Sequence, residues 1–270
     1  MKALTIPALA TATGLFITGV VAQPKPAATT SCSRDGFCYC IHDTLNSPIN
    51  QRVDEIRSLI ASQRSQGKAV GYLSTPLSTV GGGYFAINAL IASETKDRIE
   101  QQFGPRDVWV LNPGASDFSL PAEANGADYM WMWTQVLEGA DGLGAFDFVY
   151  FAGPSDFGRH FGLDGHADLE KLDIAYDDLV KTNPGLAGKV DKRAFRDYYG
   201  LRASVAFSLG SHDEWNIVRA INAKRRDADS TAGIARQMGV FFDGKPVAPG
   251  LFEASIGAGT ARGCKRDAKN

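Results

Sequence analysis

This sequence has few of the features that mark common functional classes. It has no excess of positive charge, because 28 Lys and Arg residues stand against 30 Asp and Glu residues. Proteins that bind nucleic acid depend on a basic surface, so the composition disfavours a nucleic-acid partner. The chain contains no Gly-x-Ser-x-Gly elbow for an acyl-transfer serine and no Cys-x-x-Cys pair for redox chemistry. It also lacks the spacings of the dinucleotide fingerprint and the P-loop, so we expect no cofactor.

Long apolar runs are scarce as well, and the best one stands at the N-terminus. Lys2 supplies a positive charge, residues 6–21 are apolar apart from small and threonine residues, and Ala22 offers a small residue before a cut. We therefore predict that residues 1–22 are a signal peptide and that the protein is exported, periplasmic or secreted. No second candidate span follows, so we expect no stable membrane anchor once the leader is cleaved.

Cysteine is rare but even in number, with Cys32, Cys38, Cys40 and Cys264. In an oxidising compartment four cysteines favour two disulfides over a metal cluster, and three pairings are possible. Cys38 and Cys40 are poorly spaced to join each other. We therefore expect Cys264 to join one of the three N-terminal cysteines and the other two to pair locally.

The rest of the chain reads as an extended, disulfide-bearing segment, residues 23–46, followed by a single α/β domain, residues 47–270. Apolar periodicity predicts a helix capped by Ser47 and ended by Gly67, and a second helix over 84–103 whose inward residues include Phe85 and Leu90. Short buried strands are predicted at 69–73, 107–111 and 148–151, with further helices near 129–137 and after 168. This alternation predicts a three-layer α/β/α fold with a mainly parallel, Rossmann- or flavodoxin-like sheet.

The C-terminal third is less regular. Residues 203–210 fit either a strand or the end of a helix begun at Asp191. Ser211 and Glu214 form the pattern of a capping box at the start of a further helix. Near the end, Asp243 and Gly244 predict the turn of a short hairpin.

Polar residues follow each of the three predicted strands. The carboxyl ends of parallel strands meet at one edge of a sheet, where the ligand crevice of such folds lies. We expect a small-molecule site there, built from residues after the strands and at the start of the second helix: Tyr72, Ser74, Tyr84, Asn88, Asn112 and Ser155. The loop after the third strand adds carboxylates at Asp156, Asp164 and Asp168.

This order of motifs resembles the nucleoside 2-deoxyribosyltransferase-like proteins over about residues 69–170. The stretch YLSTPL at 72–77 is similar to the family's Tyr-Leu-Ala-Gly-Pro turn, and GADGLGAFDFVYF places an Asp shortly before the third strand. The resemblance implies cleavage or transfer of the N-glycosidic bond of a nucleoside-like ligand, by a carboxylate at a helix start after the third strand. It implies that Asp141 is the acid ahead of that strand and that the nucleophile falls near Asp168 or Glu170.

Glycosidic cleavage builds positive charge on the sugar, which one carboxylate stabilises or traps while a second acid protonates the leaving group. The candidates for these roles are Asp164 and Asp168, with Asp156 or Asp141 as partner, and Tyr72 and Asn88 as orienting groups.

Two other functions remain open. His160, Asp164, His166 and Asp168 offer two imidazoles and two carboxylates, which would suit a divalent metal in a metal-dependent hydrolase. The stretch LDGHADLEKL contains no Glu-Leu-Gly, which favours a non-catalytic ligand-binding or interaction protein.

Overall fold

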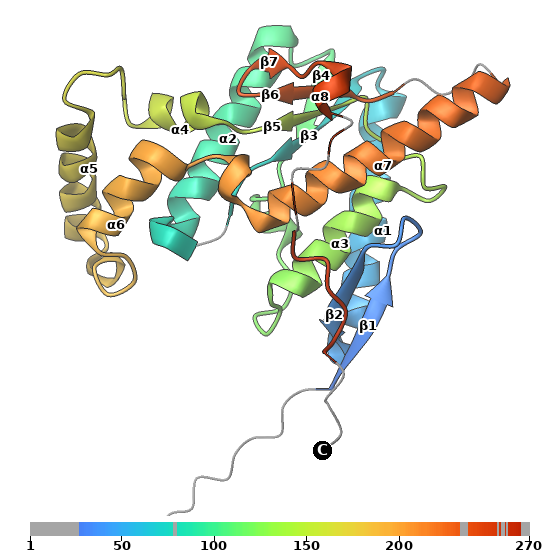
Figure 1. Cartoon of the computed structure of the whole chain (residues 1–270), viewed down its shortest axis with the longest axis horizontal. Helices are drawn as coiled ribbons and strands as arrows, with labels where there is room; N and C mark the ends of the chain where they lie inside the picture. The colour runs from blue at the N-terminus through green and yellow to red at the C-terminus, as the bar shows by residue number, and fades with distance from the viewer. Residues whose placement is uncertain are drawn as a thin grey trace, which may run out of the picture.

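The computed structural model describes residues 27–77, 80–232, 237–252, 254, 257 and 259–265. The predicted signal peptide, residues 1–22, lies outside the described residues. The described chain forms a five-stranded central sheet flanked by helices (Figure 1). This arrangement confirms the predicted three-layer α/β fold with a mainly parallel sheet.

The central sheet has the strand order β4-β3-β5-β6-β7, and only the short edge strand β7 is antiparallel. Counted along the chain from β3, this order is 2-1-3-4-5, as in the flavodoxin-like fold. The connections leave β3 first toward β4 and then toward β5, so the topological switch point lies between β3 and β5. The strands span Ala69–Ser74 (β3), Val108–Leu111 (β4), Phe148–Phe151 (β5), Gly239–Phe242 (β6) and Lys245–Pro246 (β7).

Alternation along the strands assigns the helices to the two faces of the sheet. Tyr72 pairs in register with Val149, and both belong to the large core cluster that contains α1 (Asn46–Ser65), α3 (Gly126–Glu138) and α7 (Leu209–Ala232). Leu73 and Tyr150 point to the opposite face and pack with α2 (Phe85–Phe103). The parity of a strand residue therefore decides which helices its side chain meets.

The N-terminal segment forms a hairpin of β1 (Ala28–Cys32) and β2 (Cys38–His42), and it packs on α3 (Figure 1). One disulfide joins Cys32 to Cys38 across the hairpin, and a second joins Cys40 to Cys264. Both the local pair and the long-range pair agree with the expected pattern. The disulfides fit an oxidising setting. None of the helices within the described residues is both long enough and apolar enough to span a membrane.

Between β5 and α7 the chain makes a large excursion over the end of the sheet. Its ring side chains pack together, with Phe195 against Phe161, Tyr176 and Tyr199. This excursion comprises α4 (Pro154–His160), α5 (Asp168–Thr182), α6 (Lys192–Asp197), a π-helical turn (Tyr198–Arg202) and a 3₁₀ turn (Val205–Phe207); the last helix, α8 (Pro249–Phe252), follows β7.

Several local predictions need correction. Helix α1 begins at Asn46 without a side-chain cap, so Ser47 does not cap it. On α2, Phe85 and Leu90 are half-exposed and do not face inward.

The predictions for the C-terminal third are mixed. Residues 203–210 form neither a strand nor the end of one helix, but a 3₁₀ turn that leads into α7. Helix α7 begins at Leu209, so Ser211 and Glu214 lie within it and form no capping box. The hairpin turn at Asp243 and Gly244 is confirmed, with positive φ at both positions, as a two-residue turn of this kind requires.

Candidate functional site

The carboxyl end of β3 holds a buried carboxylate, Glu214 of α7. The Tyr72 hydroxyl donates to one of its oxygens and the Ser74 hydroxyl to the other, each at 2.5 Å. Tyr72 and Ser74 are fully buried, and Glu214 is 6% exposed. We call these three residues the Glu214 cluster. The cluster joins the carboxyl end of β3 to the second turn of α7.

Burial controls the acid–base behaviour of the cluster. Burial raises the pKa of Glu214 to about 7, against the hydrogen bonds from Ser74 and Tyr72, which lower it. The pKa of Tyr72 is raised well above its usual range by burial and by the neighbouring Glu214 charge. Glu214 is therefore a carboxyl group that exchanges its proton near neutral pH while Tyr72 stays protonated, as a hydrogen-bond donor must.

The cluster lies at the position where flavodoxin-like sheets bind ligands. Ser74 is the last residue of β3, and its carbonyl accepts the N–H of Ala152, just beyond the end of β5. These two strands border the switch point. The next residue, Thr75, is 8% exposed, and its buried hydroxyl makes no hydrogen bond within the described protein. The switch point thus carries one carboxyl group and one unpartnered hydroxyl.

Asp156 is buried too, but on the other face of the sheet. Its carboxylate pairs with Arg98 of α2, contacts the Tyr150 hydroxyl at 3.0 Å and accepts the Gly153 N–H at 3.0 Å. Burial raises the pKa of Asp156, although Gly153, Arg98 and Tyr150 all lower it. Tyr150 points away from the face that carries Tyr72, so the sheet separates Asp156 from the Glu214 cluster. Asp156 and Tyr72 were expected in one small-molecule site, but they lie on opposite faces of the sheet.

Most of the acidic loop, residues 161–168, is exposed, although Phe161 and Leu163 pack against the core. Asp168 accepts the N–H groups of Asp164 and Gly165 at 3.0 and 2.9 Å, so it closes the loop in front of α5. The Asp164 side chain is 66% exposed and pairs with Lys171 at 2.5 Å. This hydrogen bond from Lys171 lowers the pKa of Asp164. Asp164 and Asp168, the two predicted nucleophiles, therefore bond groups of the loop and Lys171. Neither contacts the hydroxyl of Tyr72, which donates to Glu214.

The four residues considered as metal ligands do not gather. His160 contacts Glu94 of α2 at 2.9 Å, while Asp164 pairs with Lys171. The backbone N–H of His166 donates to Asp164 at 2.9 Å. Across the described residues, no three His, Cys, Asp or Glu side chains are placed to hold a metal ion together. The geometry expected of a metal site in this loop is therefore not found.

The predicted binding residues on the second helix meet the excursion. Asn88 is fully buried and accepts the Tyr199 hydroxyl at 2.8 Å, and its amide lies 3.4 Å from the Tyr198 hydroxyl. The Tyr84 hydroxyl accepts the Asn183 amide at 2.6 Å. Here both residues fasten the excursion to the start of α2.

The other predicted residues are also held by the protein. Asn112 accepts the Gly114 N–H at 2.9 Å and shapes the turn after β4. Ser155 donates its N–H and its hydroxyl to Asp243 at 2.9 and 2.8 Å. Asp141 is exposed, accepts the Leu143 N–H at 2.9 Å and lies in the loop that enters β5, at the amino edge of the sheet. It is therefore at the wrong edge to partner the other acids.

Sequence reasoning missed Glu214 because the pattern Ser-x-x-Glu was interpreted as a helix cap. The signal for a buried acid is its spacing, since Glu214 stands four and seven residues before Val218 and Ile221. These two residues are fully buried on the apolar face of α7. A lone carboxylate on such a face is expensive to bury, so it needs donors, and Tyr72 and Ser74 supply them.

No family model, curated protein or solved structure matches this chain. The site must therefore be interpreted from its own geometry.

Proposed function

We propose that this protein cleaves or transfers the N-glycosidic bond of a nucleoside-like ligand, with Glu214 as the carboxylate that acts on the sugar. The observation that carries the proposal is the hydrogen-bonded Glu214 cluster at the switch point of the sheet. The resemblance of the sequence to nucleoside 2-deoxyribosyltransferase-like proteins implies a carboxylate at a helix start after the third strand. Glu214 lies outside the residues that carry the resemblance, and the proposal gives it the carboxylate's role because α7 brings it to the carboxyl end of β3.

The chemistry assigns one role to each residue of the cluster. In its ionised form Glu214 attacks the anomeric carbon, or stabilises the charge there, as the electron pair of the glycosidic bond leaves with the base. The leaving base takes up a proton from water. A second water molecule or a free acceptor base then displaces the carboxylate from the anomeric carbon and releases a proton as the new bond forms. Tyr72 and Ser74 hold the two carboxyl oxygens in place, and Thr75 has a free hydroxyl for a hydroxyl group of the sugar.

Neighbouring Asp213 does not supply the second acid. Its oxygens accept the N–H and hydroxyl of Thr260 at 2.7 and 2.5 Å and the N–H of Ala261 at 3.3 Å. These bonds fix the C-terminal segment that leads to Cys264. Asp213 is thus engaged in holding the chain end against α7.

A ligand reaches Glu214 only if the covering segment moves. The 3₁₀ turn Val205–Phe207 lies over the end of β5, where the Val205 N–H donates to the Ala152 carbonyl at 3.1 Å. Phe207, the last residue of this turn, is 66% exposed, so its side chain covers little of the site. The proposal requires this turn to open, as lids over active sites do.

The experiment is a screen for release of free base from purine and pyrimidine nucleosides and 2′-deoxynucleosides, with and without a second base as acceptor. We expect turnover of at least one class and a loss of at least about a thousandfold in E214Q, which removes the nucleophile but keeps its shape. The matched control is E55Q on the exposed surface of α1, which should retain full activity. Absence of turnover in the wild-type protein with every nucleoside, or full turnover in E214Q, would overturn the proposal.

A second candidate is a ligand-binding protein without catalysis. It is favoured by the closed hydrogen bonding of the Glu214 cluster, in which both carboxyl oxygens already have donors. Saturable binding of a nucleoside without release of its base would support this function.

We also propose that the protein is exported and works in the periplasm or as a secreted protein, as the leader-like N-terminus and two disulfides support. N-terminal sequencing of protein recovered from outside the cytoplasm should begin at Gln23; a start at Met1 would contradict cleavage.

A further inference from the structure

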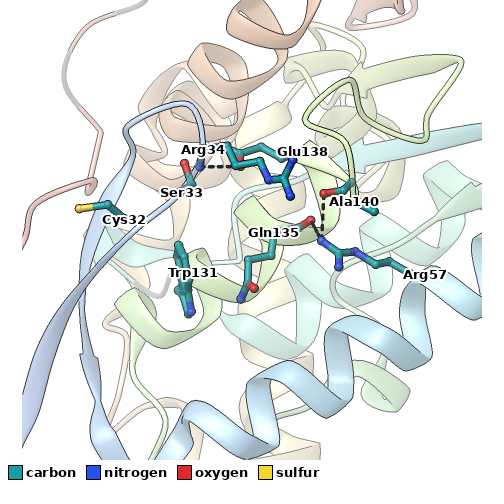
Figure 2. Close-up of a pocket in the computed structure, with 9 residues that line it drawn as sticks. Cys32, Ser33, Arg34, Arg57, Trp131, Gln135, Glu138 and Ala140 are labelled. Carbon is teal, nitrogen blue, oxygen red and sulfur yellow. Dashed lines mark hydrogen bonds between the residues drawn. The ribbon is translucent and has the colours of Figure 1, made fainter.

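A cavity of about 300 Å³ lies where the β1–β2 hairpin meets α1 and α3 (Figure 2). Its volume is at the lower end of the range for small-molecule sites. It borders the C-terminal end of α3, which leads to the amino edge of the sheet, so it is separate from the Glu214 cluster at the carboxyl edge. The lining residues are Cys32, Ser33, Arg34, Arg57, Trp131, Gln135, Glu138, Gly139 and Ala140.

Two N–H donors in this lining are buried and make no hydrogen bond within the described protein. They are Nε of Arg57 and Nε2 of Gln135. The guanidinium of Arg57 is nonetheless fixed, because Nη2 donates to the carbonyls of Gln135 and Gly139 at 2.8 and 3.0 Å. In Figure 2 the Gln135 amide lies between Trp131 and Arg57. A buried donor without an acceptor is costly, so a ligand oxygen that reaches it after a small shift of the side chain gains that free energy back.

The lining carries a net positive charge. Arg34 and Arg57 contribute two guanidinium groups, and Glu138 contributes the only carboxylate of the nine residues. That carboxylate is already engaged, because its oxygens accept the backbone N–H groups of Arg34 and Asp35 at 3.2 and 3.3 Å. One positive charge is therefore left for a ligand, and a guanidinium group favours the planar oxygens of a carboxylate.

One wall of the cavity is flat. Trp131 of α3 is only partly buried, and Figure 2 shows it standing beside the hairpin strand that carries Cys32. An indole face packs well against the carbon face of a ring. A volume of about 300 Å³ is sufficient for one six-membered ring with its substituents.

We propose that this cavity binds a small monoanion in which one carboxylate is carried by a single six-membered ring. The carboxylate meets the N–H groups of Arg57 and Gln135 and the guanidinium of Arg34, and the ring lies on Trp131. The shared chemistry is a ring carboxylate, which occurs both in sugar acids and in aromatic acids. The site does not depend on the glycosidic function proposed for Glu214.

The test is calorimetric titration of the full chain, with both disulfides formed, using sodium glucuronate and sodium benzoate. Glucose and benzyl alcohol, which have the rings without the charge, are the neutral controls. We expect at least one carboxylate to bind at least about tenfold more tightly than its neutral counterpart, the typical value of a charge-assisted hydrogen bond. Preference for glucuronate would assign the site to sugar acids, and preference for benzoate to aromatic acids.

Two variants locate the binding. R34Q and Q135L should each weaken carboxylate binding about tenfold or more, because each removes a donor from the cavity. Their matched controls are R106Q and Q101L, at exposed positions on the surface after and on α2, which should leave binding unchanged. Equal binding of carboxylates and neutral rings, or carboxylate binding that survives both R34Q and Q135L, would overturn the proposal.

Discussion

The Glu214 cluster and the acidic loop both bring carboxylates to hydrogen-bond donors, but in opposite surroundings. Glu214 is 6% exposed and receives two hydroxyl groups, whereas the Asp164 side chain is 66% exposed and receives a lysine and a backbone N–H. The pKa of Glu214 is raised to about 7 by burial, while the pKa of Asp164 is lowered by Lys171. The same functional group thus exchanges its proton near neutral pH in one place and is ionised at neutral pH in the other.

This difference shows why a count of acids is a poor guide to chemistry. The loop has two carboxylates within five residues, Asp164 and Asp168, and yet these acids close a turn and pair with a lysine. The cluster has one carboxylate, placed at the switch point and held by two residues of β3. Desolvation and position, rather than number, make an acid useful for catalysis.

Activity should separate the two regions most strongly. In the nucleoside assay the double variant D164N/D168N should keep activity within about twofold of wild type, because neither side chain reaches the Glu214 cluster. E214Q should lose at least about a thousandfold. Far-ultraviolet circular dichroism of each variant checks that the fold is retained. Strong loss in D164N/D168N with retained activity in E214Q would reverse the comparison and restore the loop as the site.

The arrangement of the sheet could be predicted because it depends on local patterns. Apolar runs at 148–151 and glycine or proline after them mark buried parallel strands whatever the rest of the chain does. Cysteine spacing likewise predicts one local and one long-range disulfide, but it does not show that Cys40 is the partner of Cys264. Tyr72 and Ser74 lie at the carboxyl edge of the sheet, as their place after a predicted strand indicates, but no sequence pattern predicts that both bond Glu214.

That partner is 140 residues from Ser74 along the chain, and no local pattern connects them. Ser211 and Glu214 have the spacing of a cap, and only the true helix start at Leu209 shows that both lie inside α7. The same limit applies to Asp156, whose face of the sheet is set by its partners Arg98 and Tyr150. Sequence indicates which edge a residue is near, but the side of the sheet depends on contacts distant in the chain.

Stability against pH should show the next largest contrast. A carboxyl group whose pKa is higher in the folded protein binds its proton more tightly there. The free energy of unfolding therefore decreases as the pH rises from the pKa of the unfolded chain to the pKa of the folded protein. For Glu214, between pH 4.5 and about 7, this amounts to about 3 kcal/mol. Denaturant unfolding at pH 5 and pH 8 should show this decrease in wild type and a smaller one in E214Q.

Asp164 supplies the control, because its pKa shift has the opposite sign. The contribution of Asp164 to the free energy of unfolding is complete above the pKa that it has in the unfolded chain. It is lost only as the pH falls through its lower pKa in the folded protein. D164N should therefore leave the difference between pH 5 and pH 8 unchanged. Asp213 and Asp156 also have raised pKa values, so E214Q should keep part of the pH dependence. A pH dependence in E214Q equal to that of wild type would show that Glu214 is not desolvated as described.

Removing one donor of the cluster should have a smaller effect. Y72F deletes the hydroxyl that donates to Glu214, which should cost about 1–2 kcal/mol of unfolding free energy and raise the pKa of Glu214 further. The matched control is Y176F, which deletes a buried hydroxyl donating to the Val190 carbonyl at 2.8 Å. Urea unfolding should show both variants less stable than wild type at pH 5. Between pH 5 and pH 8, Y72F should lose more unfolding free energy than wild type does, whereas Y176F should lose the same amount as wild type. The same profile in both variants would contradict the assigned coupling.

The smallest effect is expected at the acidic loop, where backbone conformation matters more than charge. Ala167, which precedes α5, has a φ of 53°, a left-handed conformation that costs a residue with a Cβ about 1–2 kcal/mol. A167G removes this cost, but it also gives the unfolded chain more freedom, so the net gain should be about 0.5 kcal/mol. Thermal unfolding of A167G beside A175G, an alanine within the regular part of α5, measures it. The second variant should lose about 1 kcal/mol through helix propensity alone, so destabilisation of both variants to the same extent would show that the loop is not strained at this residue.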